Sequence, residues 1–478
     1  MKTLVKEKFL KIGLIICAIL FAIPSVKYII NNGTVLNLKD DYCFLLDDSD
    51  RLVQAGIYLL LLCIFAIFYY FIIKKRKQLF NNIKEVLLFI AIISVCFAFI
   101  VPFESSDVFY YLGVGRLQSQ YNQNPYYENI KDYVDNNNVD MTNDTVLQKG
   151  YSNYWSQTTV VYGALWTLIC NAIAGMSLGN VNLGLLLFKI LNLAVHLINC
   201  YIIYKISNRK IFALIYGLNP FVLLESIANV HNDICVVLFI LLSMYFLKNK
   251  KNLILSVLFL ACATAIKYFA ILLLPIIVIY YYRNENIKTR IINCIKYGIL
   301  FGVFLAIPYL LYIQDIQVFK GMADQQSKIT KGFYLFIEEY FPQPEDLAYK
   351  LSDFALMSFI IIYLARCIVL LCNPQISLKK ELQSIYWFLL TFIFLLITGF
   401  QPWYLMWLCP IMMWQKSRDI KLIVQMQILT QIANSIFIMY TESYKYGVPF
   451  FFIFVVGTLI CIIKNKKERI VYIEKKEV

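Results

Sequence analysis

Residues 53–77 read VQAGIYLLLLCIFAIFYYFIIKKRK, an apolar run that ends in a cluster of basic residues. A helix needs roughly 20 apolar residues to cross the hydrocarbon core of a membrane. This run, like residues 86–101 and 183–204, approaches or reaches that length. The chain of 478 residues is 60% hydrophobic and only 15% charged, whereas a soluble domain carries about 25% charged residues. The sequence therefore predicts an all-α polytopic membrane protein.

The net charge of +14 raises the question of nucleic acid binding, but the distribution of the cations argues against it. The basic residues cluster in short segments between apolar runs: residues 74–77, Lys205 with Arg209 and Lys210, Lys248 with Lys250 and Lys251, and Lys464 with Lys466 and Lys467. Such clusters mark cytoplasmic loops and attract anionic lipid headgroups. We expect membrane lipids, and no nucleic acid, as partners of this charge.

Counting the spans against these clusters predicts which segments face outward. The N-terminus is placed in the cytoplasm, and residues 9–30 are read as a retained first helix because no small-residue cleavage site follows them. Residues 104–182 then form a large outer loop with interfacial helices, in which residues 158–176 lie along the membrane surface or re-enter it from outside. Residues 313–350 form a second outer loop, and residues 464–478 a basic cytoplasmic tail.

The segment 253–282 has basic residues on both flanks and is too long for one simple span. We expect a hairpin of two short helices with Lys267 near its outer turn, since broken helices are tolerated where they line a cavity. Further spans are predicted near residues 291–312, 354–372, 385–400, 403–414, 420–440 and 448–463. The total is about a dozen helices in a single domain, residues 1–478.

Cysteine and histidine usage narrows the chemistry. The 13 cysteines lie nearly all inside apolar runs, where they behave as small hydrophobes, and only Cys43 falls in a polar loop, so no disulfide is expected. With two histidines in the chain, a His-based zinc site is not expected. Asp48-Ser49-Asp50 is similar to the metal-binding motifs of nucleotide-sugar enzymes, but we interpret it as a solvated outer loop. Whether a divalent cation assists catalysis is left open.

The first candidate for catalysis is Asp107, which follows Pro102 and begins a predicted helix at the mouth of an apolar span. Aspartate at this position could serve only as a helix cap. The alternative is a general base that takes the proton of an acceptor hydroxyl. Tyr110, Tyr111 and Arg116, on the following turns, would then stack on a sugar or contact a phosphate.

A second polar group is predicted at the same level of the membrane. Asn219-Pro220 breaks a helix that rises from the cytoplasmic side, and Glu225 and the run His231-Asn232-Asp233 follow near its outer end. These side chains either cap two helices or form the second polar wall of a cavity. In the latter case, Asp233 would bind sugar hydroxyls or position the base.

Lys267, Trp403 and Tyr404 extend this candidate site. A lysine in hydrocarbon surroundings is costly unless it is paired or faces water. A phosphate is therefore a natural partner of Lys267, and snorkelling to the surface is the alternative. Trp403 and Tyr404 mark an aromatic outer turn, which either belongs to an interfacial belt or stacks on sugars and isoprenoid chains.

Taken in order, these motifs resemble those of the bacterial polyprenyl-phosphate-mannose-dependent mannosyltransferases, multispanning enzymes of the GT-C class. Asp107 begins the sequence D-x-x-x-Y-L-x-x-G-R, which ends at Arg116 and is followed by Asn124-Pro125-Tyr126. The other motifs are Tyr162-Gly163-Ala164-Leu165, Asn219-Pro220 with Glu225 and His231-Asn232-Asp233, Lys267 before Leu274-Pro275, and Pro402-Trp403-Tyr404 with Trp407. Ala164 and Val230 replace a Pro and a Gly of the family, and the resemblance runs from about residue 100 to 415.

This resemblance implies a GT-C-like bundle of about 12 transmembrane helices. It implies inverting transfer of a hexose, mannose in that family, from a polyprenyl-phosphate-sugar donor to a glycan, glycolipid or glycoprotein acceptor at the outer face of the plasma membrane. Asp107 would be the catalytic base, and Lys267 and Arg116 would hold the phosphate. Asn124, Tyr126 and the other motif residues would bind substrate. The hexose, the acceptor, the linkage and the oligomeric state are left open.

Two other classes of function remain as alternatives. A transporter or flippase for a lipid-linked saccharide would also have broken helices and intramembrane charges. It would be expected to show repeated halves, which this sequence lacks. A non-catalytic partner in an envelope-polymer complex is the second alternative, and a substituted Asp107 in relatives would favour it.

Overall fold

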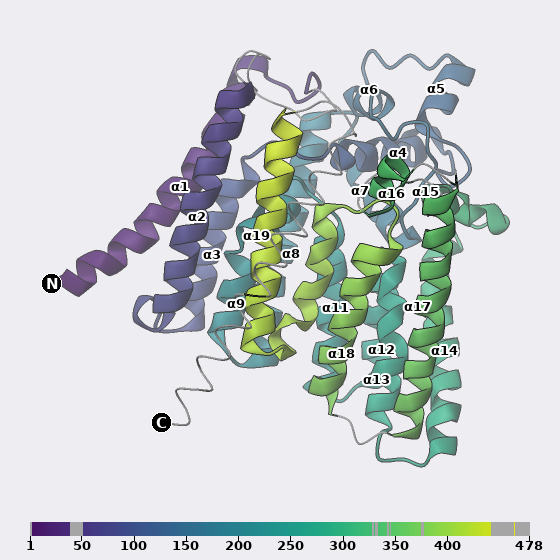
Figure 1. Ribbon diagram of the computed structural model, residues 1–478. Helices are drawn as coiled ribbons and strands as arrows, with labels where there is room; N and C mark the ends of the chain where they lie inside the picture. The colour runs from purple at the N-terminus through teal and green to yellow at the C-terminus, as the bar shows by residue number, and fades with distance from the viewer. Residues whose placement is uncertain are drawn as a thin grey trace.

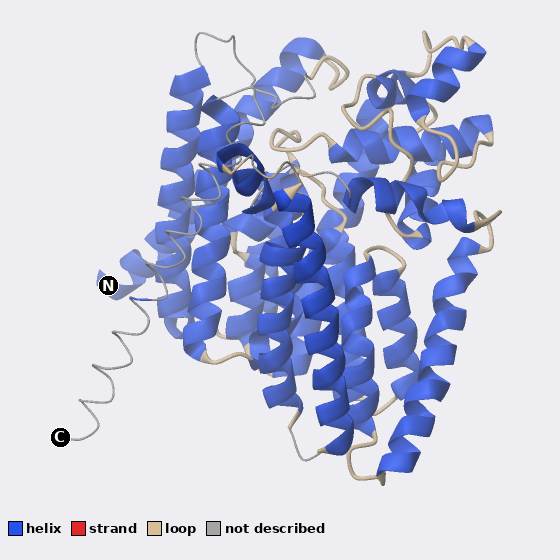
Figure 2. Cartoon of the chain, turned by 45° about the vertical axis from the view of Figure 1, so that its right-hand side comes forward, coloured by secondary structure: helices blue, strands red, loops and turns tan. Residues whose placement is uncertain are grey.

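The computed structural model describes residues 2–38, 51–326, 329, 333–341, 344, 346–373, 377–440 and 463. Every element among these residues is a helix, which confirms the all-α prediction (Figure 1 and Figure 2). Four predicted features lie outside the described residues: Cys43, the Asp48-Ser49-Asp50 motif, the span near 448–463 except for its last residue, and the tail 464–478.

Five described helices are long and apolar enough to cross a membrane. They are α1 (Lys2–Asn32), α2 (Arg51–Leu79), α8 (Val181–Ser207), α14 (Ile287–Tyr309) and α17 (Leu347–Cys372). A sixth span results if α9 (Lys210–Gly217) is joined to the segment that follows it. That segment consists of α10 (Pro220–Leu223) and the π-helical turn η2 (Leu224–Ala228), and it is bent by 56° relative to α9. The bend lies at Asn219-Pro220, as predicted, and the total of about twelve spans stays a prediction.

The remaining bundle elements include the predicted hairpin. Helices α12 (Leu253–Thr264) and α13 (Leu274–Tyr281) flank a break that contains Lys267 and the 3₁₀ segment η3 (Tyr268–Leu273). The other bundle elements are α3 (Ile83–Ala98), α11 (Asp233–Lys248), α18 (Leu378–Thr391), the π-helical turn η5 (Phe392–Leu396) and α19 (Ser417–Tyr440).

The segment predicted as a span near residues 403–414 differs from an ordinary helix. It is the buried 3₁₀ segment η6 (Pro402–Trp414). Pro410 inside it lacks the backbone N–H that a regular α-helix needs. The segment lies among other helices, and most of its side chains are buried.

Seven short elements gather at one end of the bundle, the upper end in Figure 1. They are α4 (Asp107–Tyr121), α5 (Ile130–Asn137), α6 (Thr145–Tyr151), α7 (Ala164–Met176), η4 (Ile316–Phe319), α15 (Lys320–Gln326) and α16 (Phe333–Tyr340). They come from the two segments that the sequence analysis assigned to outer loops. Helix α7 has 13 residues, about 20 Å of helix, which is too short to cross a membrane.

The basic loops meet at the opposite end of the bundle. The Lys210 ammonium donates to the carbonyls of Phe80 and Asn81, in the turn between α2 and α3. The Lys248 ammonium donates to the carbonyl of Ile206 at 3.0 Å, near the end of α8. Among the described residues, these contacts bring the basic segments after α2, around Arg209 and around Lys248 close to one another.

A close contact between α4 and α7 holds two of the outer helices against each other. A Cβ atom added to Gly115 would lie 2.1 Å from the carbonyl oxygen of Cys170, which is backbone and cannot turn aside. We therefore expect Gly115→Ala to destabilise the fold by roughly 1–3 kcal/mol, measured as a lower midpoint of thermal unfolding in detergent. Gly175→Ala is the control, because its Cβ would meet Ser119 at an ordinary 3.5 Å. Equal midpoints for the two variants would contradict this account of the contact.

Candidate active site

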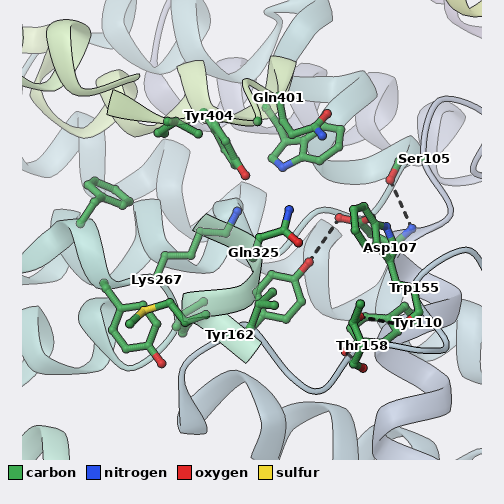
Figure 3. A pocket seen from close by; sticks show the side chains of 18 of the residues that line it. Ser105, Asp107, Tyr110, Trp155, Thr158, Tyr162, Lys267, Gln325, Gln401 and Tyr404 are labelled. Carbon is green, nitrogen blue, oxygen red and sulfur yellow. Dashed lines mark hydrogen bonds between the residues drawn. The ribbon is translucent and has the colours of Figure 1, made fainter. Parts of the chain in front are cut away.

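A cavity of about 320 Å³ opens between the outer helices and the bundle (Figure 3). Its walls come from the start of α4, the break between α12 and η3, α15 and the chain around the start of η6. Among the described residues that line it, Lys267 is the one basic side chain. Five of the predicted site residues line this cavity: Asp107, Tyr110, Lys267, Trp403 and Tyr404.

Asp107 is the first residue of α4, and its carboxylate lies at the cavity wall. Its Oδ2 accepts hydrogen bonds from the hydroxyls of Tyr111 and Tyr162, both at 3.4 Å. Burial raises the pKa of the Asp107 carboxyl, but its contact with His231 and the charge of Lys267 outweigh burial, so that the pKa lies below its ordinary value. Asp107 is therefore ionised at neutral pH and can accept a proton.

The two tyrosines that follow Asp107 have different places. Tyr110 lines the cavity, and its hydroxyl donates to the carbonyl of Thr158 at 3.1 Å. Tyr111, predicted to contact substrate, is only 1% exposed and packs edge-on against Tyr162, with ring centres 5.3 Å apart. It lies one helical turn after Asp107 on the same face of α4. Tyr111 therefore supports the carboxylate instead of lining the cavity.

Lys267 is held by a compact charged and aromatic cluster. Its ammonium lies 2.8 Å from both carboxylate oxygens of Asp233, and the Trp407 indole N–H donates to the same carboxylate at 2.5 Å. The ammonium is also 4.9 Å from the ring centre of Tyr404. The pairing stabilises a cation at this depth. Because 12% of the Lys267 side chain is exposed, it can still meet an anionic ligand in the cavity.

Glu104 is a lining carboxyl that the sequence analysis did not assign to the site. Its oxygens accept hydrogen bonds from the Gln431 amide at 2.6 and 2.5 Å, from Asn229 at 2.9 Å and from Tyr58 at 3.2 Å. Burial and the charge of Glu225 raise the pKa of Glu104 to about 8, although these donors lower it. No local motif signals this role, because the donors come from three distant segments of the chain.

Four predicted residues form a layer behind the cavity wall. Glu225, His231, Asn232 and Asp233 are each 0% exposed. They do not line the cavity of this structure, and their direct contact with substrate stays a prediction. Asp233 acts on the cavity through Lys267. In the described part of the chain, no group of three or more His, Cys, Asp or Glu side chains is arranged to hold a metal ion.

Three further predicted residues point into protein and do not line the cavity. The Arg116 guanidinium forms an ion pair with Asp144 at 2.6 Å. The Asn124 amide donates to the carbonyl of Tyr312 at 2.7 Å, and the Tyr126 hydroxyl donates to the carbonyl of Tyr162 at 2.8 Å. These side chains hold the outer helices together. In this structure Arg116 pairs with Asp144 and does not line the cavity with Lys267, so its contact with a phosphate stays a prediction.

Comparison with models of known protein families matches residues 15–283 to the N-terminal domain of alpha-(1->6)-mannopyranosyltransferases. The match covers more than half of the chain and includes Asp107, His231, Asp233 and Lys267. No curated protein and no solved structure matches the chain. The aromatic residues of η6 that complete the cavity lie beyond the matched region.

Proposed function

The chain belongs to the alpha-(1->6)-mannopyranosyltransferase family, and from the chemistry of its cavity we propose inverting transfer of mannose from a polyprenyl phosphate to an acceptor hydroxyl. The family membership agrees with the resemblance seen in the motifs. The observation that carries the proposal is that the ionised carboxylate of Asp107 and the ammonium of Lys267 line the same cavity. Figure 3 shows Asp107 and Lys267 reaching this cavity from opposite sides.

The proposed reaction uses both groups. An acceptor hydroxyl beside Asp107 loses its proton to the carboxylate while its oxygen bonds to the anomeric carbon of the donor. The bond from that carbon to the phosphate oxygen breaks on the opposite face, its electron pair leaves with the polyprenyl phosphate, and the configuration inverts. The Lys267 ammonium stabilises the departing phosphate, as preorganised charges do in many enzymes. Trp403 and Tyr404 offer aromatic faces to the sugar.

A lipid-linked donor suits the surroundings of the cavity. One lysine ammonium is a partner for one phosphate, and part of the lining is apolar, with Phe269, Met322 and Phe392. Only 11% of the residues in the most apolar stretch of α14, and of α17, are buried inside the protein, so these helices offer apolar faces to lipid. The described basic loops lie at the opposite end of the bundle, and the positive-inside bias therefore supports the proposal that the cavity opens at the outer face of the plasma membrane.

The donor proposal is tested by reconstituting the purified protein in liposomes with a membrane glycolipid extract as acceptor. Radiolabelled mannose is supplied as polyprenyl-phosphate-mannose or as GDP-mannose, and labelled glucose as polyprenyl-phosphate-glucose. We expect labelled product from polyprenyl-phosphate-mannose alone. Product from GDP-mannose would overturn the lipid donor, and product from the glucose donor would overturn the choice of sugar. Retention of the donor's anomeric configuration in the product would overturn the single-displacement mechanism.

A further inference from the structure

His231 lies between two carboxylates directly behind the cavity wall. Its Nδ1 is 3.6 Å from Oδ2 of Asp107, and its Nε2 is 3.3 Å from Oε2 of Glu225. The ring is 0% exposed and is stacked on Trp403, with centres 3.7 Å apart and planes inclined by 20°. A substrate in the cavity would touch Asp107 and Trp403 but not His231. The histidine can therefore act on the reaction only through its neighbours.

The backbone around His231 is held from several sides. Its N–H donates to the carbonyl of Glu225 at 3.0 Å, and Val230 before it has a left-handed φ of 63°. The Asn192 amide of α8 donates to the carbonyl of Ser226 at 2.7 Å. The Lys189 ammonium of α8 donates to the carbonyl of Ala228 at 2.7 Å. These contacts hold the backbone that carries the His231 side chain.

The charges around this ring favour an imidazolium. Burial lowers the pKa of His231, but its contacts with Asp107 and Glu225 outweigh burial and raise the pKa to about 9. The stacked indole of Trp403 offers a π-face to the same cation. Other charged or titratable groups also lie near the three side chains. They are Glu104 from the loop before α4, Tyr111 from α4, Tyr162 from the loop before α7, Asp233 from α11 and Lys267 from the break before η3.

We propose that His231, oriented by Glu225, is the positioning residue that keeps Asp107 ionised and aimed at the acceptor. This inference rests on the proposed function of Asp107 as the base. The imidazolium carries protons on both nitrogens, so it does not take up the acceptor's proton. That proton moves from the acceptor oxygen to Asp107 and leaves the carboxyl for water after the product departs. His231 keeps its own two protons throughout.

The sign of the expected pH effect follows from this arrangement. Removing the imidazolium leaves Asp107 buried among Glu104, Glu225 and Asp233, which raises the pKa of its carboxyl. A smaller fraction of Asp107 is then ionised at neutral pH. The acidic limb of the rate profile therefore moves to higher pH. At a pH low enough for Asp107 to be mostly protonated in both wild type and the variant, an acidic limb that lies one pH unit higher in the variant makes its rate about tenfold lower than that of wild type. At high pH the carboxylate is ionised in both proteins, so the difference narrows.

The test measures kcat/KM for mannosyl transfer between pH 5.5 and about 9.5 for wild type and His231→Gln. Because the pKa of Asp107 in wild type lies below its ordinary value, we expect the wild-type rate to show no acidic limb from Asp107 in this range. His231→Gln should show one, and the two rates should converge at high pH. His196→Gln is the matched control, because His196 is the only other histidine and lies in α8, away from the cavity; its profile should keep the wild-type shape. A loss in His231→Gln that is equal at every pH would assign His231 a purely structural role and overturn the inference.

A second readout does not depend on activity. With two histidines in the chain, ¹⁵N-histidine labelling gives two ring environments, and the His231→Gln spectrum assigns them. We expect His231 to be an imidazolium at pH 7.5 in wild type and neutral in the double variant Asp107→Asn with Glu225→Gln. A neutral His231 in wild type would overturn the inference while leaving Asp107 as the base. An Asp107→Asn enzyme with full activity would instead overturn the proposed function, even if the imidazolium were seen.

Discussion

Asp107→Asn is expected to lower the turnover of mannosyl transfer by roughly 10²–10⁴-fold, the usual contribution of a positioned general base. Asparagine has nearly the same shape as aspartate, and its carbonyl oxygen can accept from Tyr111 and Tyr162 as the Asp107 carboxylate does. It cannot take the proton of an acceptor hydroxyl at neutral pH. The rate is measured with saturating donor and acceptor, and the thermal midpoint is measured on the same preparation.

The matched control for this prediction is Asp132→Asn. Asp132 belongs to α5 in the same outer segment, is exposed and accepts from the Asn129 amide at 2.6 Å. Its variant should transfer mannose at the wild-type rate. A turnover of Asp107→Asn within a few-fold of this control would show that Asp107 is not the base. A midpoint far below that of the control would instead assign the loss to folding.

The sequence predicted those features of the fold that are set by residues close together in the chain, namely apolar spans, basic loops and breaks in helices. Apolar runs and basic clusters were sufficient to predict membrane-spanning helices and to group the described basic loops, because both act through the segment that carries them. The side of the membrane that each loop faces stays a prediction. The break at Asn219-Pro220 and the hairpin around Lys267 were predicted for the same reason. Pro220 lacks the backbone N–H that would continue the preceding helix, and a charge such as Lys267 is costly in a regular membrane helix unless it is paired or reaches a cavity.

The layers of the site could not be predicted in this way. Arg116 shares a motif with Asp107, yet nine residues on α4 amount to two and a half turns, which points the two side chains to opposite faces. The stack of Trp403 on His231 and the bond from Gln431 to Glu104 join segments that are far apart in sequence. Such tertiary contacts leave no periodic pattern in the sequence. The sequence could therefore group the polar residues of the site, but it could not distinguish those that line the cavity from those that lie behind them.

Lys267→Met is expected to reduce both stability and activity, because it leaves the buried carboxylate of Asp233 without its cation. Breaking one partner of a buried ion pair typically costs roughly 3–5 kcal/mol. The remaining donor to Asp233 is the Trp407 indole at 2.5 Å, which cannot replace a full positive charge. The measurement is the thermal midpoint in detergent together with the rate of transfer. A midpoint equal to that of wild type would contradict the structural part of this expectation.

The double variant Asp233→Asn with Lys267→Met separates folding from catalysis. It removes both charges at once, and the new amide oxygen can still accept from Trp407, so most of the lost stability should return. The cavity nevertheless lacks its one ammonium for the donor phosphate, and we expect turnover to stay about 10²–10³-fold below wild type, as when one electrostatic donor is removed from an active site. Recovery of stability and activity together would mean that Lys267 serves only to neutralise Asp233. Recovery of stability without recovery of activity would show that the Lys267 ammonium stabilises the transition state, since no folding defect would remain to explain the loss of turnover.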